Sequence, residues 1–407
     1  MSDTKTFIEQ LKIPCPTQID PKQTILLVSP MQDMRLIISH QLSKQGFKLI
    51  KSVSNAMEAL DIVREGIVKV GLIVSDMEMP LMSGVDLINE IKADPDCYGS
   101  PFVLVVNSPN KQKIMLATES GVNEILVKPF SFKDMIPKLQ TAFKGYHNPR
   151  NPEKAYDLAK ALFRKEKYQQ ATLIYEKLGE MAEQSARPYV GLAQVAEKEG
   201  DHQKALAFLE VAQNRNKHYV HTYVSRGQIY ADKKDFDKAI EQFKIAIEIS
   251  PLNPVRYEAA AKLLFEKGKY QESVNLLSIA IKNELSFPAL HHYLSQAYYV
   301  LKDFKKAIRH IRQALQHEPE NIVYMNQLGI CYKEAKMHEE SLKIYNAVIK
   351  KDPENKSALY NKSVLLYTMG STTDAIKILS RLVTLAPDFE AAHKKLKEYR
   401  ATLDDVS

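Results

Sequence analysis

Small side chains recur at a fixed interval of 34 residues through most of the C-terminal part of the chain. Two registers hold only alanine, glycine or serine in seven consecutive copies, with no insertion or deletion between them. They are Ala171, Ala205, Ala239, Ser273, Ala307, Ser341 and Ala375, and Ala159, Ala193, Gly227, Ala261, Ser295, Gly329 and Ser363. Small residues let two helices approach closely, and large apolar residues at helical spacing fill the layer between them. The pattern therefore predicts a stack of helical pairs.

Large side chains and prolines keep the same interval. The large register is Tyr175, Leu209, Phe243, Leu277, Ile311, Tyr345 and Leu379, and the prolines that end helices are Pro251, Pro319, Pro353 and Pro387. This period and pattern resemble the tetratricopeptide repeat, a helix-turn-helix unit whose copies stack into an all-α superhelix. The resemblance covers residues 152–389 and implies seven repeats. Residues 390–407 are expected to form a C-terminal capping helix and tail.

Short apolar runs alternate with helical patterns in the N-terminal part of the chain. The apolar runs lie at residues 24–28, 49–53, 71–75, 102–106 and 124–127, and the helical patterns at about 31–45, 55–66, 84–92, 111–119 and 131–143. Continuous apolar strands that alternate with helices indicate a parallel sheet covered on both faces. Five such pairs predict an α/β domain of the flavodoxin-like kind, whose site lies beyond the C-terminal ends of the strands.

Two of these strand ends carry a recognisable motif. The third strand runs into SDMEMPLMSG, whose second residue is Asp76, and the fifth runs into VKPF, whose second residue is Lys128. Together they closely resemble the receiver domain of two-component response regulators, over residues 22–146. The resemblance implies that Asp76 is the phosphoacceptor, a carboxylate nucleophile. It also implies that Lys128 contacts the phosphoryl oxygens and that Pro129 follows through a cis peptide bond.

The magnesium ligands of that family are missing from the first strand end. Mg²⁺ needs several oxygen ligands, and receivers supply an acidic pair where this chain has Ser29 and Pro30. Ser29 and Pro30 instead resemble a helix start, with Ser29 as the N-cap and Gln32 closing a capping box. We therefore expect a degenerate receiver that is phosphorylated poorly or not at all, in which Asp76 rests against Lys128.

Two further positions depart from the family pattern. Asn107 stands at the end of the fourth strand, where receivers have a serine or threonine hydroxyl, and Ile125 stands at the aromatic switch position. Glu78 is a spare carboxylate whose side chain we expect to be able to lean toward the phosphoacceptor. The alternative is a conventional regulator phosphorylated on Asp76, with weak Mg²⁺ binding there; otherwise no cofactor is expected.

The repeats suggest a binding surface for a protein. In the repeat family, the second, fifth, ninth and twelfth residues of each unit face the concave groove, which suits an extended segment or a partner helix. The patch that we favour is Tyr299, Asn326, Ile330, Val364 and Tyr367. The constellation that captures a C-terminal carboxylate in chaperone-binding repeats is absent. His291, His292 and His310 are read as isolated residues rather than metal ligands.

Composition narrows the class of protein. The chain of 407 residues has 45% hydrophobic residues and three scattered cysteines, and no apolar window long enough to span a membrane. We therefore expect a cytoplasmic protein without a disulfide framework. The net charge of +7 arises entirely after residue 146, but both signs are mixed there. A nucleic-acid-associated regulator that uses these basic repeats is the alternative of another class.

The remaining segments connect or flank these domains. Residues 1–21 contain three prolines and no clear period, so we read them as a flexible N-terminal arm, and residues 147–151 as a short linker. The combined interpretation is a non-enzymatic signalling adaptor. Its receiver is a docking or regulatory surface, for which a histidine kinase or another signalling protein is the candidate partner, and its repeats bind a protein.

Overall fold

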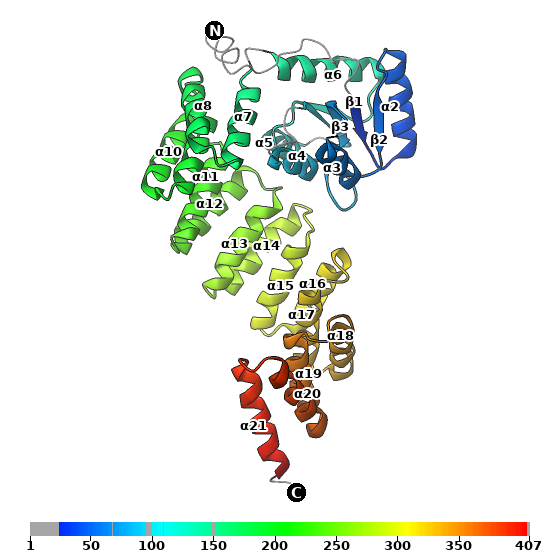
Figure 1. Ribbon diagram of the computed structural model, residues 1–407, viewed down its shortest axis with the longest axis vertical. Helices are drawn as coiled ribbons and strands as arrows, with labels where there is room; N and C mark the ends of the chain where they lie inside the picture. The colour runs from blue at the N-terminus through cyan, green and yellow to red at the C-terminus, as the bar shows by residue number, and fades with distance from the viewer. Residues whose placement is uncertain (1–23, 67, 95–99, 109, 149–150, 405–407) are drawn as a thin grey trace. The chain divides into compact units, whose positions relative to one another are not determined.

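The computed structural model describes residues 24–404, apart from residues 67, 95–99, 109 and 149–150 (Figure 1). The chain divides after Asn253 into two compact units. The first holds an α/β domain and six helices, and the second holds nine helices among the residues described. The predicted arm of residues 1–21 lies outside the described residues.

The first unit begins with a five-stranded parallel sheet. The strands are β1 (Thr24–Val28), β2 (Ile50–Val53), β3 (Val70–Asp76), β4 (Phe102–Val106) and β5 (Glu124–Val127). Their order in the sheet is β2-β1-β3-β4-β5, and every neighbouring pair is parallel. This is the order of flavodoxin-like folds, and the predicted α/β class is confirmed.

Alternation along the strands assigns the helices to the two faces of the sheet. The helices are α2 (Gln32–Lys44), α3 (Ala56–Glu65), α4 (Gly84–Ala93), α5 (Lys111–Glu119) and α6 (Phe132–His147). Leu26 and Val28 of β1 pack with α3, α4 and α5, whereas Ile25 and Leu27 pack with α2 and α6. Successive side chains of a strand point to opposite faces, so one continuous apolar run serves two cores.

Fourteen helices then form seven consecutive pairs. Those of the first unit are α7 (Glu153–Arg164), α8 (Tyr168–Met181), α9 (Arg187–Lys198), α10 (His202–Arg215), α11 (Val220–Asp232) and α12 (Phe236–Ile249). Those of the second are α13 (Pro254–Glu266), α14 (Tyr270–Lys282), α15 (Pro288–Val300), α16 (Phe304–His317), α17 (Ile322–Glu334), α18 (His338–Lys351), α19 (Lys356–Thr368) and α20 (Thr372–Leu385), and α21 (Glu390–Asp404) follows them.

The small residues that set the period lie where the helices meet. Every member of the two small registers is buried, and so is every member of the large register that begins at Tyr175. A Cβ atom on Gly329 would lie 2.6 Å from the ring of Tyr345, which belongs to the paired helix. The small residues are therefore needed because the large side chain of the same repeat occupies the adjoining space.

The turn inside each pair has its own recurrent conformation. In every repeat one residue of this turn has a positive φ, and these residues are 34 positions apart. They are Glu166, Gly200, Lys234, Gly268, Lys302, Lys336 and Gly370, with φ between 58° and 84°. A left-handed residue ends a helix and turns the chain back, so each repeat closes in the same way.

The last helix of the receiver extends a few residues further than its sequence pattern suggested. The pattern suggested a last receiver helix over 131–143 and a linker over 147–151, but α6 continues to His147. Phe143, Tyr146 and His147 are buried, so packing extends the helix through Gly145. The Tyr146 hydroxyl donates a hydrogen bond to Asp157 on α7 at 2.7 Å. The receiver and the first repeat are therefore joined by a direct buried contact.

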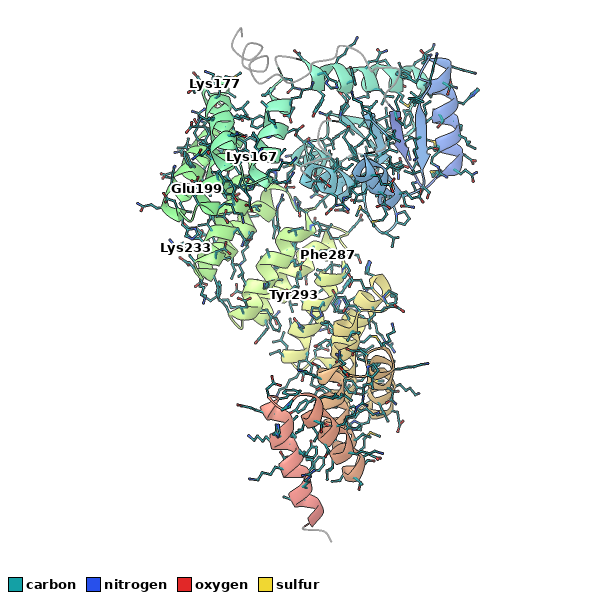
Figure 2. The ribbon with its side chains drawn as sticks, in the orientation of Figure 1. Lys167, Lys177, Glu199, Lys233, Phe287 and Tyr293 are labelled. Carbon is teal, nitrogen blue, oxygen red and sulfur yellow. The ribbon has the colours of Figure 1, made fainter. Side chains whose placement is uncertain are left out.

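The surface of the repeats carries both charge signs. Lys177, Glu199 and Lys233 are exposed side chains of the first three repeats (Figure 2). Among the helices that the structure describes, none is both long and apolar enough to cross a membrane.

Candidate functional site

The C-terminal ends of the strands bring three predicted residues together. Val28 of β1 pairs with Ser75 of β3, so the residues that follow, Ser29 and Asp76, lie side by side. The Ser29 hydroxyl donates a hydrogen bond to Asp76 Oδ2 at 2.6 Å. Lys128, just after β5, forms an ion pair with Asp76 Oδ1, at an Nζ–Oδ1 distance of 2.8 Å. Both oxygens of this buried carboxylate therefore have a protein partner.

The loop after Asp76 folds back over the strand end. A Cβ atom on Gly84 would lie 2.2 Å from the carbonyl oxygen of Asp76, so only glycine fits there without a backbone shift. Ser83 then caps α4 through a capping box with Asp86. The peptide bond between Lys128 and Pro129 is cis. The two motifs read from the sequence thus form one continuous site.

The predicted capping role of Ser29 is wrong. The helix α2 begins at Gln32, and its N-cap is Met31, which makes no side-chain capping bond. Pro30 accordingly lies two residues before the helix rather than in its first turn. The Ser29 hydroxyl donates to Asp76 instead, while its oxygen accepts a hydrogen bond from the Met31 amide at 3.3 Å. The capping pattern involves only neighbouring residues, whereas Asp76 lies 47 residues away in the chain. The hydroxyl nevertheless binds Asp76, because a hydrogen bond to a buried, charged carboxylate is stronger than one to a backbone amide.

Asn107 and Glu78 form a second cluster beside Asp76. The Asn107 side-chain amide donates to Glu78, and Lys113 of α5 pairs with the same carboxylate at 2.7 Å. Glu78 is thus held toward α5, and in the part of the chain that the structure describes it makes no hydrogen bond or ion pair with Asp76. Ile125 is partly buried and packs on the core below α3, α4 and α5.

The side chains at this site do not fit a magnesium ion. Of the residues that the structure describes, Asp76 is the one carboxylate directly at the C-terminal strand ends, and both its oxygens are bonded, while Glu78 is engaged with Asn107 and Lys113. The Arg35 guanidinium donates to the carbonyl oxygen of Ser29 at 2.6 Å, so a cation already lies beside the first strand end. Mg²⁺ requires several oxygen ligands in near-octahedral geometry, and this arrangement supplies too few.

Comparison with known families agrees with the geometry. Residues 25–140 match the model of the response regulator receiver domain. Residues 139–219, 220–251, 288–321 and 333–398 match models of the tetratricopeptide repeat. The chain is a receiver domain followed by tetratricopeptide repeats. The resemblances that the sequence suggested are thereby confirmed.

Relatives of the receiver are single-domain chemotaxis proteins. Chemotaxis protein CheY-3 of Vibrio cholerae is 29% identical over 126 residues, which cover 31% of this chain and 95% of that protein. The probable chemotaxis protein CheY of Rhizobium etli is 26% identical over 125 residues, with the same coverage of 31% and 95%. For the repeats, a solved structure of the C-terminal part of a repeat-containing protein from Cytophaga hutchinsonii covers 58% of this chain and 98% of its own, at 18% identity and a TM-score of 0.49.

The groove patch predicted in the second unit is partly engaged within the chain. Tyr367 stacks on Tyr399 of α21 with a centroid distance of 3.7 Å, and Asn326 donates to Asn355 at 3.3 Å. Tyr299 contacts the ring of Phe304, at 5.9 Å between centroids. Ile330 and Val364 are partly buried. Of the five residues, Tyr367 is the one most clearly occupied by packing, because the C-terminal helix lies on it.

A hollow on the groove side of the first three repeats was not predicted. It has a volume of about 370 Å³, and its lining combines aromatic and cationic side chains. It includes the fifth, ninth and twelfth residues of the first two repeats, namely Tyr156, Lys160, Phe163, Val190, Gln194 and Glu197. The available signal was Lys160 beside Tyr156 and Phe163 at the groove positions of the first repeat, although later repeats were favoured for the binding patch.

Two of the three histidines read as isolated, His291 and His310, in fact belong to a cluster. His291 of α15 and His310 of α16 approach each other with an Nδ1–Nδ1 distance of 3.3 Å, and their rings stack. The Ser286 hydroxyl lies 3.2 Å from His291 Nε2 and 3.0 Å from His317 Nε2. Among the residues that the structure describes, no group of His, Cys, Asp or Glu side chains is arranged to hold a metal ion.

Proposed function

We propose that this protein is a cytoplasmic signalling adaptor whose receiver domain acts as a docking and regulatory module without an efficient phosphorylation switch. Its repeats bind a protein partner, and the chain itself catalyses no reaction. Receiver domains and tetratricopeptide repeats both serve protein recognition, which supports the general role. The observation that carries the finer proposal is the pairing of both Asp76 oxygens with Ser29 and Lys128.

The bonding around Asp76 explains why phosphorylation would be slow. Attack of a carboxylate on a phosphoryl group brings two negative charges together, and a metal ion normally offsets them. Here Ser29 replaces one of the acidic ligands and stabilises the unmodified carboxylate by a short hydrogen bond. The Asp76 carboxylate is stabilised before it reacts, and the metal ion that would stabilise the transition state of phosphoryl transfer lacks its ligands. Both effects raise the activation free energy of phosphorylation.

Phosphorylation is tested with purified full-length protein, acetyl phosphate and Mg²⁺, followed by mass spectrometry of the intact chain. We expect little or no phosphorylated wild-type protein on the timescale of an active receiver. The double variant Ser29→Asp, Pro30→Asp restores the acidic pair and should gain phosphorylation, and adding Asp76→Asn should abolish that gain. Rapid phosphorylation of the wild-type protein at Asp76 would favour the conventional phospho-responsive regulator instead.

Partner binding is tested by affinity capture with full-length protein and with a fragment of residues 147–407. We expect both baits to retain the same discrete protein, because the groove lies in the repeats. Capture by the full-length bait alone would place the receiver in the interface. Retention of nothing but nuclease-sensitive, salt-labile material would contradict the adaptor role.

A further inference from the structure

The hollow of the first three repeats is walled by aromatic rings around one lysine. Tyr156 lies on α7, Tyr175 on α8 and Tyr219 just before α11, and all three line the hollow with Lys160. Gly191 makes room there, because a Cβ atom on it would lie 2.5 Å from the Tyr175 ring. The shape therefore depends on contacts inside the repeats themselves.

The charges of the lining are unbalanced. Lys160, Arg164, Arg187 and Lys198 face one carboxylate, that of Glu197. Arg187 is already neutralised by Glu153, with an Nη1–Oε1 distance of 2.6 Å, and lies 3.8 Å from the centre of the Tyr156 ring. Lys160 makes no hydrogen bond or ion pair with the residues that the structure describes. The hollow therefore keeps an excess of positive charge.

The environment of Lys160 disfavours its charge in the free protein. Burial, followed by the charges of Arg187 and Lys92, lowers the pKa of Lys160 to about 8, and the attraction of Asp157 only partly offsets them. A partly buried cation of this kind gains free energy when an anion binds, since the pair replaces the lost hydration. An anionic occupant would match it.

The receiver contributes to a neighbouring hollow of about 310 Å³. That hollow shares Lys160, Arg187, Tyr219 and His221 with the first, and Lys92 of α4 and Gly121 form part of its wall. The Lys92 ammonium donates to the Gly121 carbonyl oxygen at 2.7 Å, so it is held at this edge of the receiver. The lysine of the repeats is thus flanked by a positive charge of the receiver.

We propose that this hollow binds a partner segment through one Asp or Glu side chain, whose carboxylate pairs with Lys160 while an adjacent apolar residue packs on the tyrosine rings. The inference rests on the proposed role of the repeats in binding a protein and names the chemistry of the segment. Charge complementarity with Lys160, which has no ion pair of its own, argues for an anionic side chain in the segment. The aromatic walls favour a segment that is not acidic throughout.

The test begins with a phage-displayed library of random dodecapeptides selected on the full-length protein. Enriched peptides are synthesised with a fluorescent label, and their affinity is measured by fluorescence anisotropy. We expect the peptides to share an acidic residue, and its replacement by the corresponding amide to weaken binding by about tenfold or more. Lys160→Gln should cause a similar loss, whereas Lys160→Arg should retain affinity within about threefold.

Lys262 provides a matched control. It occupies the same ninth position in the fourth repeat and is exposed, so Lys262→Gln removes an equal charge outside the hollow. We expect that variant to bind the peptides as the wild type does. Circular dichroism checks that each variant is folded; if Lys160→Gln is not, the amide-substituted peptides and Lys160→Arg still decide the outcome.

Binding should also depend on pH. As the pH rises through about 8, Lys160 loses its charge and the affinity for the carboxylate should fall. The charged and titratable groups that face it are Arg187, Lys92, Arg164, Asp157, Glu153 and His221. Lys160→Arg should lose this dependence, because a guanidinium stays protonated there.

The inference is overturned if the selected peptides share no acidic residue or bind Lys160→Gln with wild-type affinity. If the peptides still bind the repeats at another place, only the inference about the hollow fails, and the proposed adaptor role is unaffected. If the library yields no binder and the fragment of residues 147–407 also captures no protein, both proposals fail.

Discussion

Asp76 occupies a phosphoacceptor position but is bonded like a structural residue. Its side chain is 9% exposed, and that of Lys128 is 17% exposed, so their ion pair at 2.8 Å is largely removed from solvent. The hydrogen bond from Ser29 satisfies the other oxygen. Such a pair contributes little net stability, yet removing one partner leaves a buried charge uncompensated. The site therefore behaves as a linked unit in which each residue depends on the others.

The first prediction concerns that linkage. Lys128→Met should destabilise the receiver by about 3 kcal/mol, because Asp76 would lose its countercharge while remaining buried. Adding Asp76→Asn should recover much of the loss, since the remaining group is neutral. Native-state hydrogen exchange of β3 amides measures both effects locally. Equal destabilisation by the single and double variants would show that the pair is not energetically coupled.

We expect the histidine cluster of the second unit to be sensitive to acid. Burial, followed by the charges of His317 and Arg309, lowers the pKa of His291 to about 4. Burial, followed by the charges of Arg309 and His291, lowers the pKa of His310 to about 4, with Lys306 also nearby. The contact between the two Nδ1 atoms needs one nitrogen to donate and the other to accept, so it requires a neutral acceptor ring.

The second prediction follows from the sign of these shifts. The unfolded chain takes up protons near the ordinary histidine pKa of about 6.5, before the folded chain does. The contribution of these histidines is therefore fully present above about pH 6.5 and is lost as the pH falls toward 4, by up to about 3 kcal/mol per histidine. Hydrogen exchange of α15 and α16 across this range measures the loss.

His310→Gln is the control for that measurement, because glutamine does not titrate. It should flatten the pH dependence of exchange in α15 and α16, even if it lowers stability at neutral pH. An unchanged slope in the variant would mean that other groups, such as carboxylates, cause the acid sensitivity.

At the scale of elements, each repeat is closed by a left-handed residue. Gly200, Gly268 and Gly370 meet this requirement without strain, whereas lysine or glutamate fills it in the other repeats. A Cβ atom on Gly200 would meet nothing within 4 Å, so its conformation alone requires glycine. Gly145 lies in open space inside α6, where no such conformation is required.

The third prediction contrasts these two glycines. Gly200→Ala should destabilise the neighbouring repeats by about 1 kcal/mol, because a side chain disfavours the left-handed region. Gly145→Ala should instead stabilise α6 by about 0.5–1 kcal/mol, because alanine restricts the unfolded chain and favours the helix. Urea midpoints followed by circular dichroism compare the two variants. Destabilisation by Gly145→Ala would indicate that α6 needs flexibility there.

At the scale of the whole molecule, charge does not mark a nucleic-acid surface. The net charge of +7 arises after residue 146, and both signs are interspersed there among the exposed side chains of the repeats. Lys177, Glu199 and Lys233 illustrate this mixture (Figure 2). Strong phosphate binding requires lysines and arginines gathered along one path, since counterion release supplies most of the affinity.

The fourth prediction tests the nucleic-acid alternative. Binding of a fluorescent DNA duplex to the full-length protein should be weak at low salt and undetectable at physiological salt. A steep linear loss of log affinity with log salt concentration, from a tight complex at low salt, would support the alternative. Anisotropy titrations at several salt concentrations distinguish the two.

The sequence alone determined the elements and their kind of arrangement. The registers that begin at Ala171, Ala159 and Tyr175 repeat at a fixed interval along the sequence. They predicted the helical pairs because closely packed helices need small residues at fixed positions. The runs ending at Val28 and Asp76 predicted a buried parallel sheet for a similar reason. Boundaries were less certain where burial extends a helix, as at the end of α6.

Only the tertiary structure decided which side chains meet. Ser29 carries a local capping pattern, but its hydroxyl binds Asp76 from another strand. His291 and His310 look unrelated until two helices pack side by side, and Lys160 has an unpaired charge because of what surrounds it in three dimensions. Periodicity records the contacts that every repeat shares. The free energy of a buried polar group depends instead on the particular side chains beside it. Those side chains come from distant positions in the sequence, so a local pattern cannot predict them.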